Sequence, residues 1–158
     1  MSRANVSELQ SRRFARRGLL VAVFAIGLAL GANAARASSA EFVVIVNKKN
    51  PAVGVSSEFL ADAFLKKAVH WDHGASIRAA DQRTDSAVRR AFSTTILKRT
   101  VAAVRNYWQQ RIFSGREVPP PEFDSDAAVI HYVQKHDGGV GYVSPDAALD
   151  GVKVIPYR

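Results

Sequence analysis

The 158-residue chain contains no cysteine, so it forms no disulfide and has neither a thiolate metal site nor a cysteine nucleophile. It also lacks the Gly-x-Ser-x-Gly turn of serine hydrolases and the glycine-rich phosphate loop of nucleotide-binding enzymes. These absences favour a protein that is not an enzyme. We expect no cofactor and no metal, and a stability that comes from packing alone.

Acidic residues are outnumbered, and the formal net charge is +8. The excess is uneven, because the first 37 residues hold six arginines and one glutamate. The remainder of the chain carries only +3, which is ordinary for a domain of this size. The charge therefore does not indicate a nucleic-acid partner.

The beginning of the chain has the three parts of an export signal. A basic stretch at residues 12–17 precedes an uncharged apolar run at residues 19–30, and Ala35-Arg36-Ala37 is a small-x-small cleavage site. The apolar run is shorter than the roughly 20 residues that span a bilayer, which favours cleavage over an uncleaved signal anchor. We expect a cleaved signal peptide at 1–37, one domain at 38–158, and a periplasmic or secreted protein.

Apolar runs alternate with capped, helix-forming segments along the rest of the chain. The run at residues 42–46 (Phe-Val-Val-Ile-Val) is typical of a strand that is buried on both faces by helices. Pro119-Pro120-Pro121 excludes a helix and predicts an extended surface crossing. Strands that alternate with helices predict an α/β fold with about four strands. The expected strands are 42–46, 77–80, 140–143 and 152–155, and the expected helix caps are Ser56 or Ser57, Asp85 or Ser86, Thr100, and one of Asp124, Ser125 and Asp126.

The stretch 80–92 is the main candidate for a functional site. It predicts a strand end, a polar turn and a helix whose buried stripe is Val88, Ala91, Phe92, Thr95 and Ile96. A helix start attracts anions, because it carries unpaired N–H groups and the positive end of the helix dipole. The alternative is an ordinary capped helix with solvated arginines. The candidate ligands for a small oxyanion are Arg83, Thr84, Asp85, Ser86 and Arg89.

Four segments occur in a suggestive order. They are residues 43–51 (Val-Val-Ile-Val-Asn-Lys-Lys-Asn-Pro), residues 58–67 followed by Trp71, residues 86–92 (Ser-Ala-Val-Arg-Arg-Ala-Phe), and residues 138–143 (Gly-Gly-Val-Gly-Tyr-Val). Together they resemble the phosphate-binding members of the type 2 periplasmic solute-binding superfamily. That family has a strand with an Asn-Pro turn, a Leu-x-x-Ile-Phe-x-Gly-Lys segment followed by Trp, a Ser-Gly-Thr-Arg-x-x-Phe motif and a Gly-Ala-Ile-Gly-Tyr-Val strand.

The resemblance implies a three-layer periplasmic-binding-protein-like lobe with a mixed sheet. It also implies a protein that binds phosphate or a similar oxyanion for a membrane transporter. Ala87 and Val88 stand where the family has glycine and threonine, and Gln82 stands where the phosphate binders have an arginine. Glycine lets a ligand approach the backbone and threonine adds a hydroxyl, so these departures predict a weaker pocket. The resemblance covers mainly one lobe of a two-lobed protein, which predicts an open site.

Two other interpretations remain. The chain is alternatively a periplasmic protein-interaction module that has lost ligand binding and docks to another envelope protein. A metal-assisted hydrolase using His70 and His73 has no second ligand pair to support it.

For Asp81, no pattern in the sequence indicates a raised pKa. Core packing is favoured over a binding groove for the large aromatic residues Trp71, Tyr107, Trp108 and Phe113.

Overall fold

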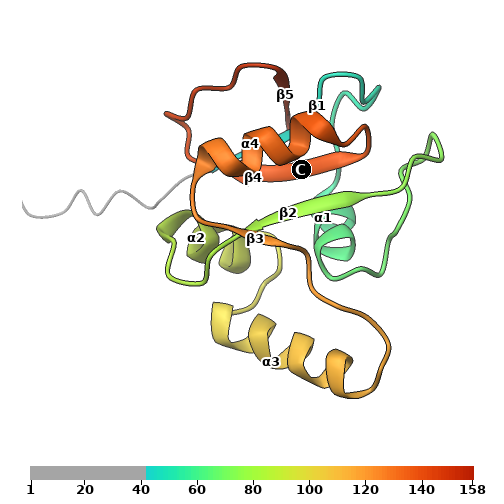
Figure 1. The fold of residues 1–158 in the computed structure, drawn as a ribbon, viewed down its shortest axis with the longest axis vertical. Coiled ribbons are helices and arrows are strands. Elements are labelled where there is room, and N and C mark those ends of the chain that lie inside the picture. The colour runs from blue at the N-terminus through green and yellow to red at the C-terminus, as the bar shows by residue number, and fades with distance from the viewer. Residues whose placement is uncertain (1–41) are drawn as a thin grey trace, which may run out of the picture. The chain divides into compact units, whose positions relative to one another are not determined.

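A mixed five-stranded sheet organises residues 42–158, the part of the chain that the computed structural model describes (Figure 1). The predicted signal peptide at 1–37 lies outside these residues. The strand order is β3-β2-β4-β1-β5. β2 is parallel to both of its neighbours, whereas β1 is antiparallel to β4 and β5. The strands are β1 (Val43–Asn47), β2 (Arg78–Gln82), β3 (Glu122–Phe123), β4 (Gly139–Val143) and β5 (Val152–Ile155).

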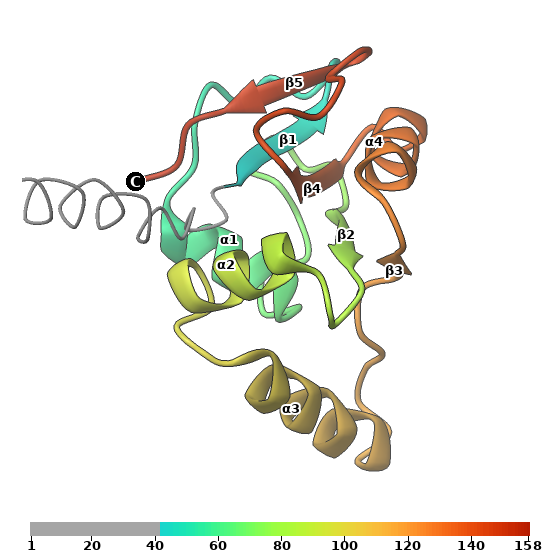
Figure 2. The same ribbon diagram turned by 90° about the vertical axis from the view of Figure 1, so that its left-hand side faces the viewer.

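Helices cover both faces of the sheet, which confirms the predicted α/β class (Figures 1 and 2). α1 (Ser57–Phe64), α2 (Ala87–Thr95) and α3 (Val101–Phe113) share one apolar core, and α4 (Asp126–Lys135) packs in a second core on the other face. No helix within residues 42–158 is both long and apolar enough to cross a membrane.

Alternation along β1 builds the two cores. Val44 and Val46 pack with side chains of the first three helices, whereas Ile45 packs with α4. All three side chains are almost fully buried. The strand is therefore apolar on both faces, as its continuous β-branched sequence predicts.

A hydroxyl caps each of the four described helices. In every case the side-chain oxygen accepts the backbone N–H three residues further on, which satisfies one of the N–H groups that the helix itself leaves unpaired. This decides between the alternative caps that the sequence left open. The capping residues are Ser56, Ser86, Thr100 and Ser125.

Three predictions about elements were wrong or incomplete. The extended crossing after the prolines ends in β3, which pairs with the end of β2 and brings the sheet to five strands. Thr95 is exposed, and the buried face of α2 includes Arg89 instead. Phe113 is 89% exposed, because it lies on the side of α3 opposite the buried Val104. The tryptophans are in the core as predicted: Trp71 and Trp108 are buried.

Candidate functional site

The start of α2 lies directly after the carboxyl end of β2. Ser86 is extended at φ −62° and ψ 135°, and its Oγ accepts the Arg89 N–H at 3.3 Å. The Arg90 N–H donates to the Ser86 carbonyl at 3.1 Å. The N–H groups of Ala87 and Val88 have no acceptor within the helix, because no helical carbonyl lies four residues before them. They are the groups through which this helix end attracts negative charge.

The Ser86 hydroxyl is also a donor within the protein. It donates to Gln82 Oε1 at 2.7 Å, and Gln82 Nε2 in turn donates to Asp126 Oδ1 at 2.7 Å and to the Tyr142 carbonyl at 3.1 Å. Asp126 Oδ2 accepts from the Ser144 hydroxyl at 2.5 Å and from its N–H at 3.2 Å. The Ser86 proton therefore has a partner already, and a carboxylate lies one side chain beyond it.

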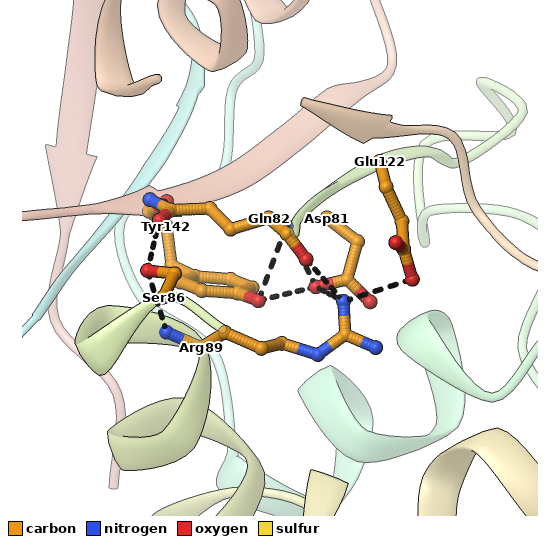
Figure 3. Close-up of polar contacts among 6 residues, drawn as sticks. All are labelled: Asp81, Gln82, Ser86, Arg89, Glu122 and Tyr142. Atoms are coloured by element: carbon orange, nitrogen blue, oxygen red, sulfur yellow. Dashed lines mark hydrogen bonds and ion pairs between the residues drawn. The ribbon is translucent and has the colours of Figure 1, made fainter. Parts of the chain in front are cut away.

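Arg89 points away from the helix start (Figure 3). Its side chain is 3% exposed, and Nη1 lies 2.5 Å from Asp81 Oδ1, 2.6 Å from the Gln82 carbonyl and 3.6 Å from Glu122 Oε1. A buried guanidinium needs such partners, because an unpaired charge is costly in the interior. Arg89 thus joins α2 to the end of β2 and to β3, and its charge is neutralised internally.

Asp81 is the acidic centre of this cluster. It accepts from the Tyr142 hydroxyl and, at 2.9 Å, from the Gln82 N–H. Burial raises the pKa of Asp81 to about 6, although Arg89, Tyr142 and the Gln82 N–H each lower it. Burial and the neighbouring Asp81 also raise the pKa of Tyr142. We define Asp81, Gln82, Arg89, Glu122 and Tyr142 as the ion-pair cluster.

The turn before α2 is open to solvent. Arg83, Thr84 and Asp85 are exposed, and Arg83 Nε lies 2.5 Å from Asp85 Oδ1. A second carboxylate, that of Asp124, lies 4.0 Å from Arg83 Nη1. Arg90 Nη1 donates to the Asp85 carbonyl at 2.7 Å. The Asp85 carboxylate therefore turns towards Arg83 and does not occupy the helix start.

The five predicted ligand-binding residues thus fall into two groups. Arg83, Thr84 and Asp85 form an exposed turn with the half-buried Ser86 at its end. The Arg89 side chain, in contrast, is buried and pairs with Asp81. Sequence reasoning missed the ion-pair cluster and the raised pKa of Asp81. One signal was present, because Asp81 directly follows the expected strand 77–80, and a carboxylate buried there needs a cation or hydrogen-bond donors beside it. The identity of its partners depended on the fold.

Other polar and hollow regions lie elsewhere. A hollow of about 500 Å³ is lined by residues 51–56, Phe59 and residues 71–73, and another of about 370 Å³ includes Lys66 and Arg78. His73 stacks on Trp71 with ring centroids 6.1 Å apart. Within residues 42–158, no three His, Cys, Asp or Glu side chains are grouped so as to hold a metal ion.

The fold is that of an α/β lobe of the periplasmic-binding-protein kind. Comparisons with protein-family models and with curated proteins find no match. Among solved structures, the neighbours are phosphate ABC transporter substrate-binding proteins.

An ABC-type phosphate transport receptor from Vibrio cholerae is 18% identical with a TM-score of 0.57, and the match covers 73% of this chain and 45% of the receptor. A substrate-binding protein with bound phosphate from Clostridium perfringens is also 18% identical, with a TM-score of 0.58 and coverages of 73% and 44%. PstS from Borrelia burgdorferi is 12% identical, with a TM-score of 0.57 and coverages of 74% and 47%. The chain thus matches less than half the length of these proteins, and at such identities the likeness establishes the fold.

Proposed function

We propose that this protein is an exported solute-binding-like protein that holds a small oxyanion, such as phosphate, at the start of α2. The observation that carries the proposal is the position of this helix start. It follows β2 directly, with the leading amides of Ala87 and Val88 unused by the helix, in a fold shared with phosphate receptors. The structurally similar proteins are transport receptors and binding proteins, which favours binding over catalysis for this chain.

The residues take different roles in this proposal. The amides of Ala87 and Val88 donate to the anion, and Arg83, which also pairs with Asp85, supplies an exposed positive charge on the same turn. Thr84 offers a hydroxyl on the same exposed turn. Arg89 is a positioning residue, because its guanidinium is committed to Asp81 and reaches the anion through no contact of its own.

Calorimetric titration of the purified protein with phosphate and sulfate tests the proposal. We expect saturable binding that weakens severalfold in Arg83→Ala, because the anion loses the exposed cation of this turn. Arg78→Ala is the matched control, since Arg78 is an exposed arginine at the other end of β2. No heat of binding at millimolar anion, or equal affinities in both variants, would contradict the assignment of this turn.

Ser86→Ala needs a control for lost helix capping, which by itself lowers stability by about 1 kcal/mol. Ser56→Ala removes an equivalent cap from α1, where the Ser56 Oγ accepts the Phe59 N–H at 3.0 Å. We expect both variants to lose stability and only Ser86→Ala to weaken anion binding, because Ser86 caps the helix whose first amides donate to the anion. A change of affinity in both would assign the effect to stability.

The second candidate is a protein-interaction module for an envelope partner. It is favoured by one observation: the Ser86 hydroxyl and Arg89 already have partners inside the protein. Chemical cross-linking followed by purification from the envelope fraction tests this candidate. A stoichiometric partner, together with no calorimetric response to anions, supports it over the oxyanion function. Recovery of the protein alone contradicts it.

Export rests on the sequence. We expect the protein in the periplasmic or secreted fraction with an N-terminus at Ser38, because the Ala-x-Ala site ends at residue 37. N-terminal sequencing of the fractionated protein measures this. An intact N-terminus in the membrane fraction would indicate an uncleaved signal anchor instead.

A further inference from the structure

The positive charge of the described residues is concentrated around α3. Residues 42–158 contain 16 lysines and arginines and 12 acidic residues, a net charge of +4. Residues 98–117 alone hold five of the basic residues and one of the acidic ones, which is also +4. The rest of the domain is therefore balanced, and one helix with its flanking turns carries the excess.

Most of these cations are available to a partner. Arg111 pairs with Glu117 at 3.1 Å. Within residues 42–158, the other four basic side chains of the segment make no ion pair and all are exposed: Lys98, Arg99, Arg105 and Arg116. Exposed basic side chains of this density attract anionic surfaces over a distance of about one Debye length, roughly 10 Å at 0.1 M salt.

Large apolar side chains are exposed within the same segment. Phe113 is 89% exposed, Val118 63% and Ile112 50%. Ile112 follows Arg105 by seven residues, so the two share one side of the helix, while Phe113 lies opposite the buried Val104. Exposed apolar and basic side chains on one helix and its flanking turns favour a partner that offers both negative charge and an apolar phase.

α3 is placed where it can meet a flat surface. In both views it lies at the edge of the domain, beyond α2 (Figures 1 and 2). Only Val104 and Trp108 of its 13 residues are buried. The other side chains of α3 are therefore left at least partly open to solvent within residues 42–158.

We propose that the surface formed by Lys98, Arg99, Arg105, Ile112, Phe113, Arg116 and Val118, the α3 surface, binds the surface of a membrane that contains anionic phospholipid. The cations meet the lipid phosphates, and Phe113 and Ile112 enter the boundary between head groups and acyl chains. Nucleic acid fits less well, because the exposed aliphatic side chains gain nothing from a phosphate backbone. The proposal is independent of oxyanion binding at α2.

The absence of cysteine makes a local test possible, since a single introduced thiol is labelled uniquely. Gln109→Cys places an environment-sensitive fluorophore one helical turn before Phe113, on an exposed position. Ala127→Cys, at an exposed position on α4, is the matched control. Each full-length labelled protein is titrated with phosphatidylglycerol vesicles and with phosphatidylcholine vesicles. Both labelled proteins contain residues 1–37, so any vesicle binding through those residues is common to both.

We expect a blue shift at position 109 with phosphatidylglycerol vesicles, no shift at position 127, and loss of the response in about 0.5 M salt. Combining Ile112→Ser with Phe113→Ser weakens the response by about tenfold or more, because the apolar contact is removed. The proposal is overturned if both labels respond equally, if the double variant responds as the parent does, or if neither label responds. A response to polyglutamate but not to vesicles would replace the membrane with an acidic protein partner.

Discussion

The Asp81–Arg89 ion pair holds the first turn of α2 against the end of β2. It is sealed from water, and it links a strand to a helix through charged atoms 2.5 Å apart. Such a pair is costly to break from one side, because the remaining charge is left buried and unpaired. The pair therefore fixes the direction of the helix start even though it contacts no ligand in our proposal.

Replacing Arg89 alone tests this role. We expect Arg89→Met to lower the free energy of unfolding by about 3 to 5 kcal/mol, because Asp81 loses its counter-charge. The double variant Asp81→Asn with Arg89→Met should lose less than the sum of the single variants, as expected for two residues in contact. Urea denaturation measures all three. Arg90→Met, at the exposed neighbouring position, should change stability by less than about 0.5 kcal/mol.

The raised pKa of Asp81 predicts a pH dependence. The folded protein binds this proton up to about pH 6, whereas the unfolded chain releases it near the ordinary value of 3.8. Protonated Asp81 therefore contributes its full stabilisation below about pH 4, and this contribution is lost as the pH rises through 6. The free energy of unfolding falls by about 3 kcal/mol over this range. In urea denaturation, we expect the free energy of unfolding of the wild type, minus that of Asp81→Asn, to decrease from about pH 4 to pH 7. A difference independent of pH would contradict the burial of an ionisable Asp81.

At the scale of elements, glycines let α4 lie close against β4. A Cβ at Gly141 would lie 2.7 Å from Val129 Cγ1 and 3.2 Å from Val133 Cγ2. Both valines are fully buried on α4. A side chain at this position must therefore push the helix away from the sheet, near the point where Asp126 meets Gln82.

Gly141→Ala should lower the free energy of unfolding by about 1 to 3 kcal/mol through overpacking. Adding Val129→Ala removes the nearest methyl group, so the double variant should be more stable than the two single losses predict. Thermal denaturation of the three variants measures the coupling. Strict additivity would show that the helix shifts without strain.

At the scale of the whole molecule, the candidate oxyanion site is open. Arg83 and Thr84 are exposed, so an anion there keeps part of its hydration and its charge is screened by salt. A receptor that encloses its ligand avoids this screening. We expect phosphate affinity to fall severalfold between about 0.05 and 0.5 M sodium chloride in calorimetric titrations. An affinity that is insensitive to salt would indicate an enclosed site and contradict the open geometry.

The fold followed from local patterns, and the environment of the site did not. The β-branched run of β1 and the hydroxyl caps predicted the elements, because each acts on its immediate neighbours. Arg89 was predicted to bind a ligand, and that role remains a prediction; in the structure its guanidinium pairs with Asp81 and Glu122. Asp81 lies on β2 and Glu122 lies on β3. Their approach depends on the packing of β2, β3 and α2, which spacing along one segment does not encode.

The sequence by itself determined an α/β lobe, a helix capped at Asp85 or Ser86 and a chain without disulfides, since strand burial, capping and cysteine content are read from neighbouring residues. Only the tertiary structure decided which charges are buried and which are exposed. It neutralised Arg89 beneath the helix start and left the cations around α3 on the surface. The reason is that the energy of a charge depends on its distance from water and from opposite charge, and both are set when distant segments pack together.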